Sequence, residues 1–91
     1  VLEVAGNRRR FVIVDGAIIG RERGSAVRLD DNHLSAAHAR LRRDGQAWTI
    51  EDLGSRNGTF VNGRRVDRAA LAPGDRVRVG SSDLTVERPA R

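Results

Sequence analysis

His-Ala-Arg-Leu-Arg over residues 38–42 and Ala-Trp-Thr-Ile-Glu-Asp over residues 47–52 are the two stretches that decide the fold. In the second stretch Trp48 and Ile50 alternate with polar neighbours. A period of two predicts half-buried antiparallel strands, with apolar side chains on one face only. The Asp-Gly pair at residues 44–45 lies between the two stretches, and glycine accepts the positive φ that tight hairpin turns require. The sequence therefore predicts a β-hairpin here.

Similar runs of apolar and β-branched residues recur on both sides of this hairpin. They are Leu2–Val4, Phe11–Val14, Ile18–Gly20, Val27–Leu29, Arg76–Val79 and Leu84–Glu87. Further turn signals separate several of them, notably Asn57-Gly58 and Asn62-Gly63. The only helix-like stretch, Val66–Ala72, is about two turns long and stops at a proline, so we expect a loop or a frayed turn there. Many short strands with regular turns predict an all-β sandwich or barrel.

Length and composition limit the organisation of the chain. Its 91 residues, with a hydrophobic fraction of 38% and no cysteine, are enough for one core without disulfides, so residues 1–91 are predicted to form a single domain. Because the first residue is valine and residues 88–91 resemble the start of a linker, we expect a module of a longer protein. No apolar run approaches the roughly 20 residues that span a bilayer, which favours a soluble, cytoplasmic location.

The charge pattern bears on possible partners. The formal net charge is +5, and all 17 basic residues are arginines. These arginines are interleaved with 12 acidic residues, and aromatic residues, which would stack on bases, make up only 3% of the chain. We therefore expect no nucleic-acid partner, although binding through the arginines remains an alternative.

Catalytic and metal-binding patterns are weak. Ser35 and His38 share a segment, but no acid is evident to orient the histidine as a base. The group of His33, His38, Asp30 and Asp31 has neither the spacing of a zinc site nor that of a calcium loop. No glycine-rich phosphate loop follows a strand. The sequence predicts no enzyme, no metal and no cofactor.

Three other segments carry the chemistry of anion binding. Gly20-Arg21 ends a strand with a guanidinium, which can offer two parallel N–H donors to a phosphate. Ser35 precedes a strand, and His38 follows three positions later. The segment 54–63 contains two Asn-Gly turns around the mainly apolar residues Thr59-Phe60-Val61.

Taken in this order, the three segments resemble the motifs of forkhead-associated (FHA) domains. The stretches 48–53 and 71–80 also look like that family, so the resemblance covers nearly the whole chain. It implies a sandwich of two twisted antiparallel sheets with about eleven short strands, packed through alternating apolar side chains. It also implies that the ligand binds on loops at one end.

The resemblance assigns binding roles to four residues. Arg21 and Ser35 match the positions that hold phosphate, and Asn57 matches the position whose amide bonds the peptide backbone beside a phosphothreonine. Arg56 is adjacent and is expected to assist. Ala36 departs from the many relatives that carry a polar or basic side chain there, so we expect a modest affinity. Taken singly, these residues also fit a surface arginine, a capping hydroxyl and a turn asparagine.

Five further residues have supporting roles under the same resemblance. Gly20, His38, Gly58 and Asn62 match positions that keep the loops in shape. His33 matches a position that helps to select peptide residues after the phosphothreonine.

The expected function is a phosphothreonine-dependent interaction module that recruits a phosphorylated protein in Ser/Thr kinase signalling. A threonine preference makes physical sense if a small apolar pocket takes the extra methyl, worth about 0.8 kcal/mol. A phosphate-independent assembly module on the same fold is the first alternative. Nucleic-acid binding, as above, is the second.

Overall fold

The computed structural model describes residues 2–6 and 8–88. Apart from Arg88, the predicted linker start at 88–91 lies outside these residues. Eleven strands are present: β1 (Leu2–Gly6), β2 (Arg9–Ile13), β3 (Ala17–Gly20), β4 (Val27–Arg28), β5 (Ala39–Asp44), β6 (Ala47–Asp52), β7 (Thr59–Val61), β8 (Arg64–Val66), β9 (Arg68–Leu71), β10 (Arg76–Val79) and β11 (Ser82–Glu87).

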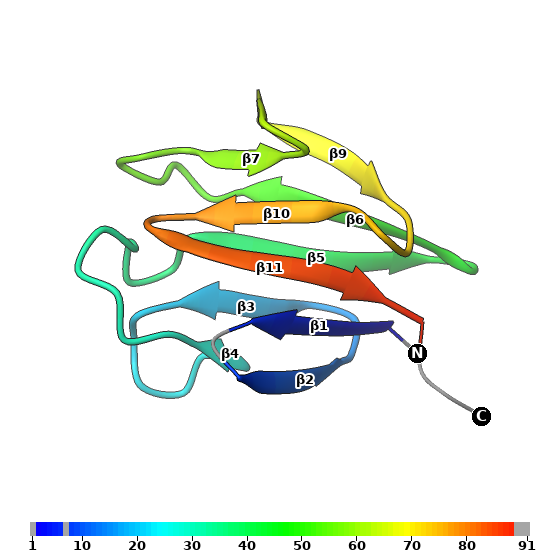
Figure 1. The fold of residues 1–91 in the computed structure, drawn as a ribbon, viewed down its shortest axis with the longest axis horizontal. Coiled ribbons are helices and arrows are strands. Elements are labelled where there is room, and N and C mark those ends of the chain that lie inside the picture. Colours follow the sequence, from blue (N-terminus) through cyan, green and yellow to red (C-terminus); the bar gives the residue numbers. More distant parts are fainter. Residues whose placement is uncertain (1, 7, 89–91) are drawn as a thin grey trace.

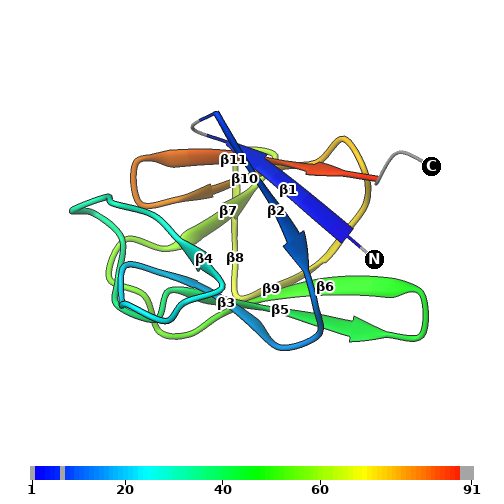
Figure 2. The ribbon, with the colours of Figure 1, turned by 90° about the horizontal axis from the view of Figure 1, so that it is seen from below.

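The strands form two sheets that pack face to face, seen as two layers in Figure 2. One sheet has six strands in the order β2-β1-β11-β10-β7-β8, and the other has five in the order β4-β3-β5-β6-β9. The predicted sandwich and its strand number are confirmed. One pairing departs from the antiparallel expectation, because β4 runs parallel to β3 with Ile19 beside Val27. The two strands are joined by the short segment 21–26, and β4 itself has only two residues.

The β5–β6 hairpin forms the centre of the five-stranded sheet. Its register places Leu41 opposite Ile50, and both side chains are fully buried between the sheets. On the outer face Arg40 lies opposite Glu51, and the two form an ion pair. Gly45 takes a positive φ of 65° in the turn. The alternation read from the sequence thus separates the core from the solvent face as predicted.

The core fills the space between the inner faces of the two sheets. Ile19, Leu41 and Ile50 come from one sheet. Val4, Val77 and Leu84 come from the other.

The prediction of a loop or frayed turn over residues 66–72 was wrong. β8 pairs with β7, and β9 pairs with β6, where Ala70 lies opposite Thr49. Leu71 is buried and Ala70 is exposed, so the segment has the alternation of a strand. Alanines favour a helix in isolation, but pairing with β6 and burial of Leu71 override that weak preference.

The strand ends that carry the predicted site meet at one end of the sandwich, at the left of Figure 1. β3 ends there at Gly20 and β5 begins there, and Ile19 lies opposite Ala39. β6 also ends there, β7 begins there, and β10 turns there into β11. Three loops therefore converge, the segments 21–26, 29–38 and 53–58. Among the described residues no helix is long and apolar enough to cross a membrane.

Candidate functional site

A shallow cleft lies where the three loops meet. Its lining residues are Arg21, Asn32, His33, Leu34, Ser35, Ala36, Arg56 and Asn57. The structure thus brings together every residue predicted to contact a phosphopeptide, from segments that are up to 36 residues apart in sequence (Arg21 to Asn57). The polar side chains that line the cleft are two guanidinium groups, one hydroxyl, one imidazole and the two amides of Asn32 and Asn57, and no carboxylate of a described residue lines it.

Backbone hydrogen bonds hold the first two loops together. The Arg21 amide donates to the Ser35 carbonyl at 3.1 Å, and the Glu22 amide donates to the Ala36 carbonyl at 3.1 Å. Gly20 permits this approach, because a Cβ there would overlap the Ala36 carbonyl oxygen and lie 2.9 Å from its carbon. Gly20 is therefore needed for close packing between loops and not for a positive φ.

His38 joins the second loop to the third from a fully buried position. Its Nδ1 accepts a hydrogen bond from the Ser35 amide at 3.1 Å, and its Nε2 lies 2.8 Å from the Gly58 carbonyl. An amide only donates and a carbonyl only accepts, so the ring carries its proton on Nε2 and donates it to Gly58. Both ring nitrogens are thus occupied by backbone groups.

Ser35 is oriented by the third loop. Its Oγ accepts a hydrogen bond from the Arg56 amide at 3.1 Å. A hydroxyl that accepts one bond still has its own proton to donate. The Ser35 hydroxyl, which is half-buried at the cleft wall, therefore remains a donor for a bound anion.

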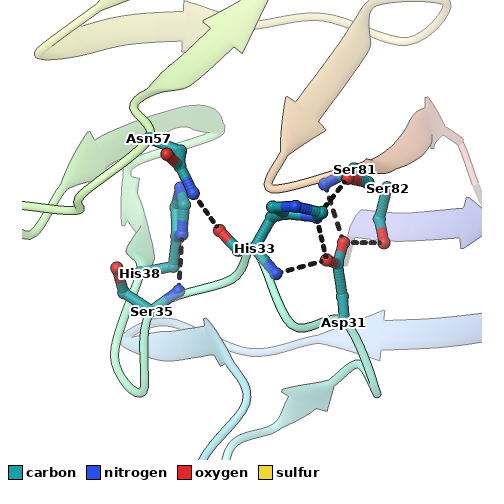
Figure 3. A network of polar contacts seen from close by, with 7 residues as sticks. All are labelled: Asp31, His33, Ser35, His38, Asn57, Ser81 and Ser82. Carbon is teal, nitrogen blue, oxygen red and sulfur yellow. Dashed lines mark hydrogen bonds and ion pairs between the residues drawn. The ribbon is translucent and has the colours of Figure 1, made fainter.

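Asn57 spans the cleft to the loop that carries His33, as Figure 3 shows. Its Nδ2 donates to the His33 carbonyl at 2.7 Å. This bond orients the amide and leaves the Asn57 Oδ1 as an acceptor and the second Nδ2 hydrogen as a donor. An extended peptide backbone presents the complementary N–H and C=O groups.

Asp31 fastens the His33 loop to the turn between β10 and β11 (Figure 3). Its carboxylate accepts hydrogen bonds from the amides of His33 and Ser81, at 2.9 and 2.8 Å, and from the Ser82 hydroxyl at 2.7 Å. The His33 ring is 69% exposed, and its Nδ1 lies 2.8 Å from the Ser81 hydroxyl. Leu34 is buried and anchors the same loop in the core.

Asp52 organises the third loop in the same way and was missed by the sequence analysis. One carboxylate oxygen accepts from the Gly54 and Ser55 amides, and the other accepts from the Ser55 and Thr59 hydroxyls at 2.5 and 2.7 Å. The Ser55 hydroxyl in turn accepts from the Gly58 amide at 3.0 Å. The order Asp52-Leu53-Gly54-Ser55 is the available signal, because aspartate often accepts bonds from amides two and three residues later.

These networks lower the pKa of both aspartates. Burial raises the pKa of Asp52, but hydrogen bonds from Ser55 and Thr59 outweigh it, so the net pKa lies below the ordinary 3.8. The pKa of Asp31 is also lowered, because the bonds from Ser82, His33 and Ser81 outweigh the effect of burial.

A loss of stability in acid follows from these shifts. A carboxylate with a folded pKa below its unfolded value stabilises the fold above the unfolded pKa, and this stability disappears as the pH falls through the folded pKa. Urea unfolding should therefore show lower stability at about pH 3 than at about pH 6. Asp52→Asn should cost about 1 kcal/mol or more at the higher pH, because an amide nitrogen would face hydroxyl and amide donors. The same variant should lose less on acidification, and an unchanged pH dependence would contradict this role.

The two cleft arginines are free to meet a ligand. Arg21 and Arg56 are exposed, and neither guanidinium makes a hydrogen bond or ion pair within residues 2–6 and 8–88. Several other arginines are neutralised, such as Arg10 by Glu3 and Glu87. The cleft is thus a positively charged site whose guanidinium donors have no partner in the part of the chain that the structure describes.

The remaining two predicted loop residues occupy different ends of β7. Gly58 has a φ of 88° at the cleft end. Asn62, with a φ of 52°, lies at the other end, where its side chain donates to Asp75 and accepts from the Arg76 amide. Asn62 does shape a loop, but it is not brought to the cleft.

Neither the Ser35–His38 pair nor the acidic and histidine residues near it form a catalytic or metal site among the described residues. His38 faces the backbone amide of Ser35, while the Ser35 hydroxyl is bonded to the Arg56 amide. No histidine thus activates this hydroxyl in the described structure. Within the same residues no three His, Asp or Glu side chains are grouped to hold a metal ion.

Comparison with known proteins agrees with this fold. The family model for the FHA domain matches residues 17–80. FhaA, an FHA domain-containing protein of Mycobacterium tuberculosis, is 40% identical over 82 residues, which are 89% of this chain and 16% of FhaA. The chain belongs to the FHA domain family, a family of protein-interaction modules rather than of enzymes.

Solved structures show the same likeness. An FHA domain from a structural and functional analysis of phosphothreonine-dependent FHA domain interactions has a TM-score of 0.92 and 34% identity, covering 99% of this chain and 98% of that one. Mycobacterium tuberculosis EmbR, in complex with a low-affinity phosphopeptide, has a TM-score of 0.89 and 26% identity, covering 94% of this chain and 24% of EmbR.

Proposed function

We propose that the chain binds phosphothreonine on a partner protein and so recruits that partner in Ser/Thr kinase signalling. The observation that carries this proposal is the convergence of two arginines and an oriented hydroxyl on one cleft. Among the described residues the two guanidiniums have no partner, and no carboxylate lines the cleft. A phosphate carries a charge of about −1.5 to −2 at pH 7 and accepts several charge-assisted hydrogen bonds. Arg21, Arg56 and Ser35 supply the donors.

Asn57 is the residue that would bind the peptide backbone next to the phosphate. Its amide is held by the His33 carbonyl and keeps one acceptor and one donor for the peptide. His33 remains the candidate for selecting flanking residues, because it is one of the cleft residues and its ring is exposed. Asn57 and His33 would thus read the peptide while the arginines and Ser35 read the phosphate.

Several supporting points belong to the same proposal. EmbR binds a phosphopeptide with the same fold, and phosphothreonine dependence is described for another structural neighbour. We infer that the chain catalyses nothing, since both nitrogens of His38 are occupied by backbone groups. We infer a cytoplasmic setting because kinase-written phosphothreonine is the proposed ligand.

Binding to peptide pools tests the function. Fluorescence polarisation should detect binding to a degenerate phosphothreonine pool, weaker binding to the phosphoserine pool and none to the unphosphorylated pool. Affinity should also fall as the pH is lowered through about 6, where the phosphate gains its second proton. Phosphoserine binding as tight as phosphothreonine binding would contradict the methyl preference.

The two alternatives give different results in the same assay. A phosphate-independent assembly module would bind its partner equally after phosphatase treatment. A nucleic-acid site would lose affinity steeply with added salt and would need several arginines replaced before it failed. If none of the three peptide pools bound, the result would favour the assembly module.

A further inference from the structure

Arg65 lies beside the cleft on the outer face of β8. Its register partner is Phe60 on β7, and side chains alternate along a strand, so Arg65, Phe60 and Gly58 share one face. Arg65 then leans toward the cleft end. A Cβ built on Gly58 would lie 2.7 Å from the Arg65 Nε and 3.0 Å from its Cζ. The guanidinium therefore occupies the space that a side chain at position 58 would take.

This contact places a third cation next to the peptide-binding loop. Gly58 directly follows Asn57 and precedes β7, the strand next to the edge strand β8. Gly58 is nevertheless buried. Gly58 also accepts the His38 hydrogen bond through its carbonyl, so the backbone beneath Arg65 is fixed. Arg65 thus lies over a rigid part of the third loop.

Within residues 2–6 and 8–88 no acidic group neutralises the charge of Arg65. The side chain is exposed, and it makes no hydrogen bond or ion pair with another described residue. By contrast, Arg78 lies on the other side of Phe60 on the same face and is paired with Asp83. An unpaired guanidinium packed beside a peptide-binding loop is suited to an anion supplied by the ligand.

We propose that Arg65 is a specificity residue that selects phosphopeptides carrying a second anionic group. This inference rests on the proposed phosphothreonine site. The Arg56 amide is hydrogen-bonded to the Ser35 hydroxyl, so it marks the place of the phosphate. The distance from this amide to the Arg65 guanidinium is at most about 13 Å, the sum of the covalent spacings from Arg56 to Gly58 and the contact of Gly58 with Arg65. An extended peptide covers that distance in about four residues. The second anion is therefore a carboxylate or a second phosphate within about four residues of the phosphothreonine.

A peptide scan tests the inference on the folded domain. A parent phosphothreonine peptide with neutral flanks is compared with variants that carry one glutamate, or its glutamine control, at each position up to about four residues away. At one or two adjacent positions glutamate should bind about two- to five-fold more tightly than glutamine, the range of an exposed ion pair. A further peptide carries a second phosphothreonine in place of the glutamate. Comparing its affinity with that of the glutamate peptide shows whether Arg65 prefers a phosphate or a carboxylate.

The matched variants are Arg65→Gln and Arg64→Gln. Both remove one positive charge, but Arg64 lies opposite the inward-facing Val61 and so belongs to the other face of β8. Arg65→Gln should abolish the preference for the acidic peptide and leave binding of the neutral parent within about two-fold. Arg64→Gln should keep the preference.

The outcomes separate this inference from the proposed function. If the neutral parent binds through its phosphate but glutamate gives no advantage at any position, the inference is overturned and the function stands. A preference that survives Arg65→Gln also overturns the inference. Failure of every phosphopeptide to bind overturns both.

Discussion

Arg21→Ala should lower the affinity for a phosphothreonine peptide at least about ten-fold. Hydrogen bonds to charged groups contribute about 1.5 to 3 kcal/mol, and a factor of ten corresponds to about 1.4 kcal/mol. The Arg21 guanidinium is exposed at the cleft and has no partner within the described part of the chain, so its bonds are available to the phosphate. Isothermal titration calorimetry with one peptide gives the two dissociation constants.

A neighbouring arginine provides the control for the Arg21 result. Arg23→Ala removes the same charge from the same loop, but Arg23 is not among the residues that line the cleft. Its effect should stay within about two-fold at physiological salt. Arg21→Lys keeps the charge and loses the planar pair of donors, so it should fall between wild type and Arg21→Ala. Equal losses in Arg21→Ala and Arg23→Ala would mean that general charge, and not this site, attracts the peptide.

His38→Ala should lower the free energy of unfolding by about 2 to 4 kcal/mol. The substitution leaves the Ser35 amide and the Gly58 carbonyl without partners and opens a cavity at a fully buried position. A buried donor or acceptor left unpaired costs about 1 to 3 kcal/mol. Because the same bonds join two of the three loops, peptide affinity should fall as well. Urea unfolding followed by Trp48 fluorescence measures the stability.

The second histidine gives the comparison for His38. His33→Ala removes an exposed ring that lies near Ser81, so it should change the stability by less than about 1 kcal/mol. His38→Asn keeps one donor and one acceptor on a shorter side chain and should be intermediate. If His38→Ala and His33→Ala lowered stability equally, His38 would not have the structural role that its two hydrogen bonds indicate.

Much of the fold was predictable because local and tertiary preferences agree. The alternation through residues 38–52, with a glycine at the turn, requires the same face to be buried that the second sheet covers. The family motifs then predicted the sandwich and its strand number, and both are confirmed. Strand β9 was not predicted, because its two alanines do not indicate a strand. The segment is a strand only because it pairs with β6.

The cleft residues were predictable from motifs, but the residues that brace them were not. Arg21, Ser35 and Asn57 belong to short patterns that stand out in a single sequence, and the structure places all three in one cleft. Their roles in binding remain predictions. Asp31 acts through Ser81 and Ser82, about 50 positions later, and no local pattern announces a partner at that distance.

The hydrogen bonds among the three loops determine which molecule, the domain or its partner, loses more conformational entropy on binding. Asn57, Asp31 and His38 tie the loops together without a ligand, so in the domain mainly the exposed side chains of the cleft are left to order. A phosphorylated segment that is disordered before binding loses about 1 to 2 kcal/mol for each backbone residue it fixes. The ordering of backbone thus falls mainly on the partner, while the domain orders the side chains of Arg21 and Arg56. Partner segments that fix few residues on binding would have the highest affinity for their size. The number of residues that stay free in the complex would influence the affinity as much as the sequence of the partner does.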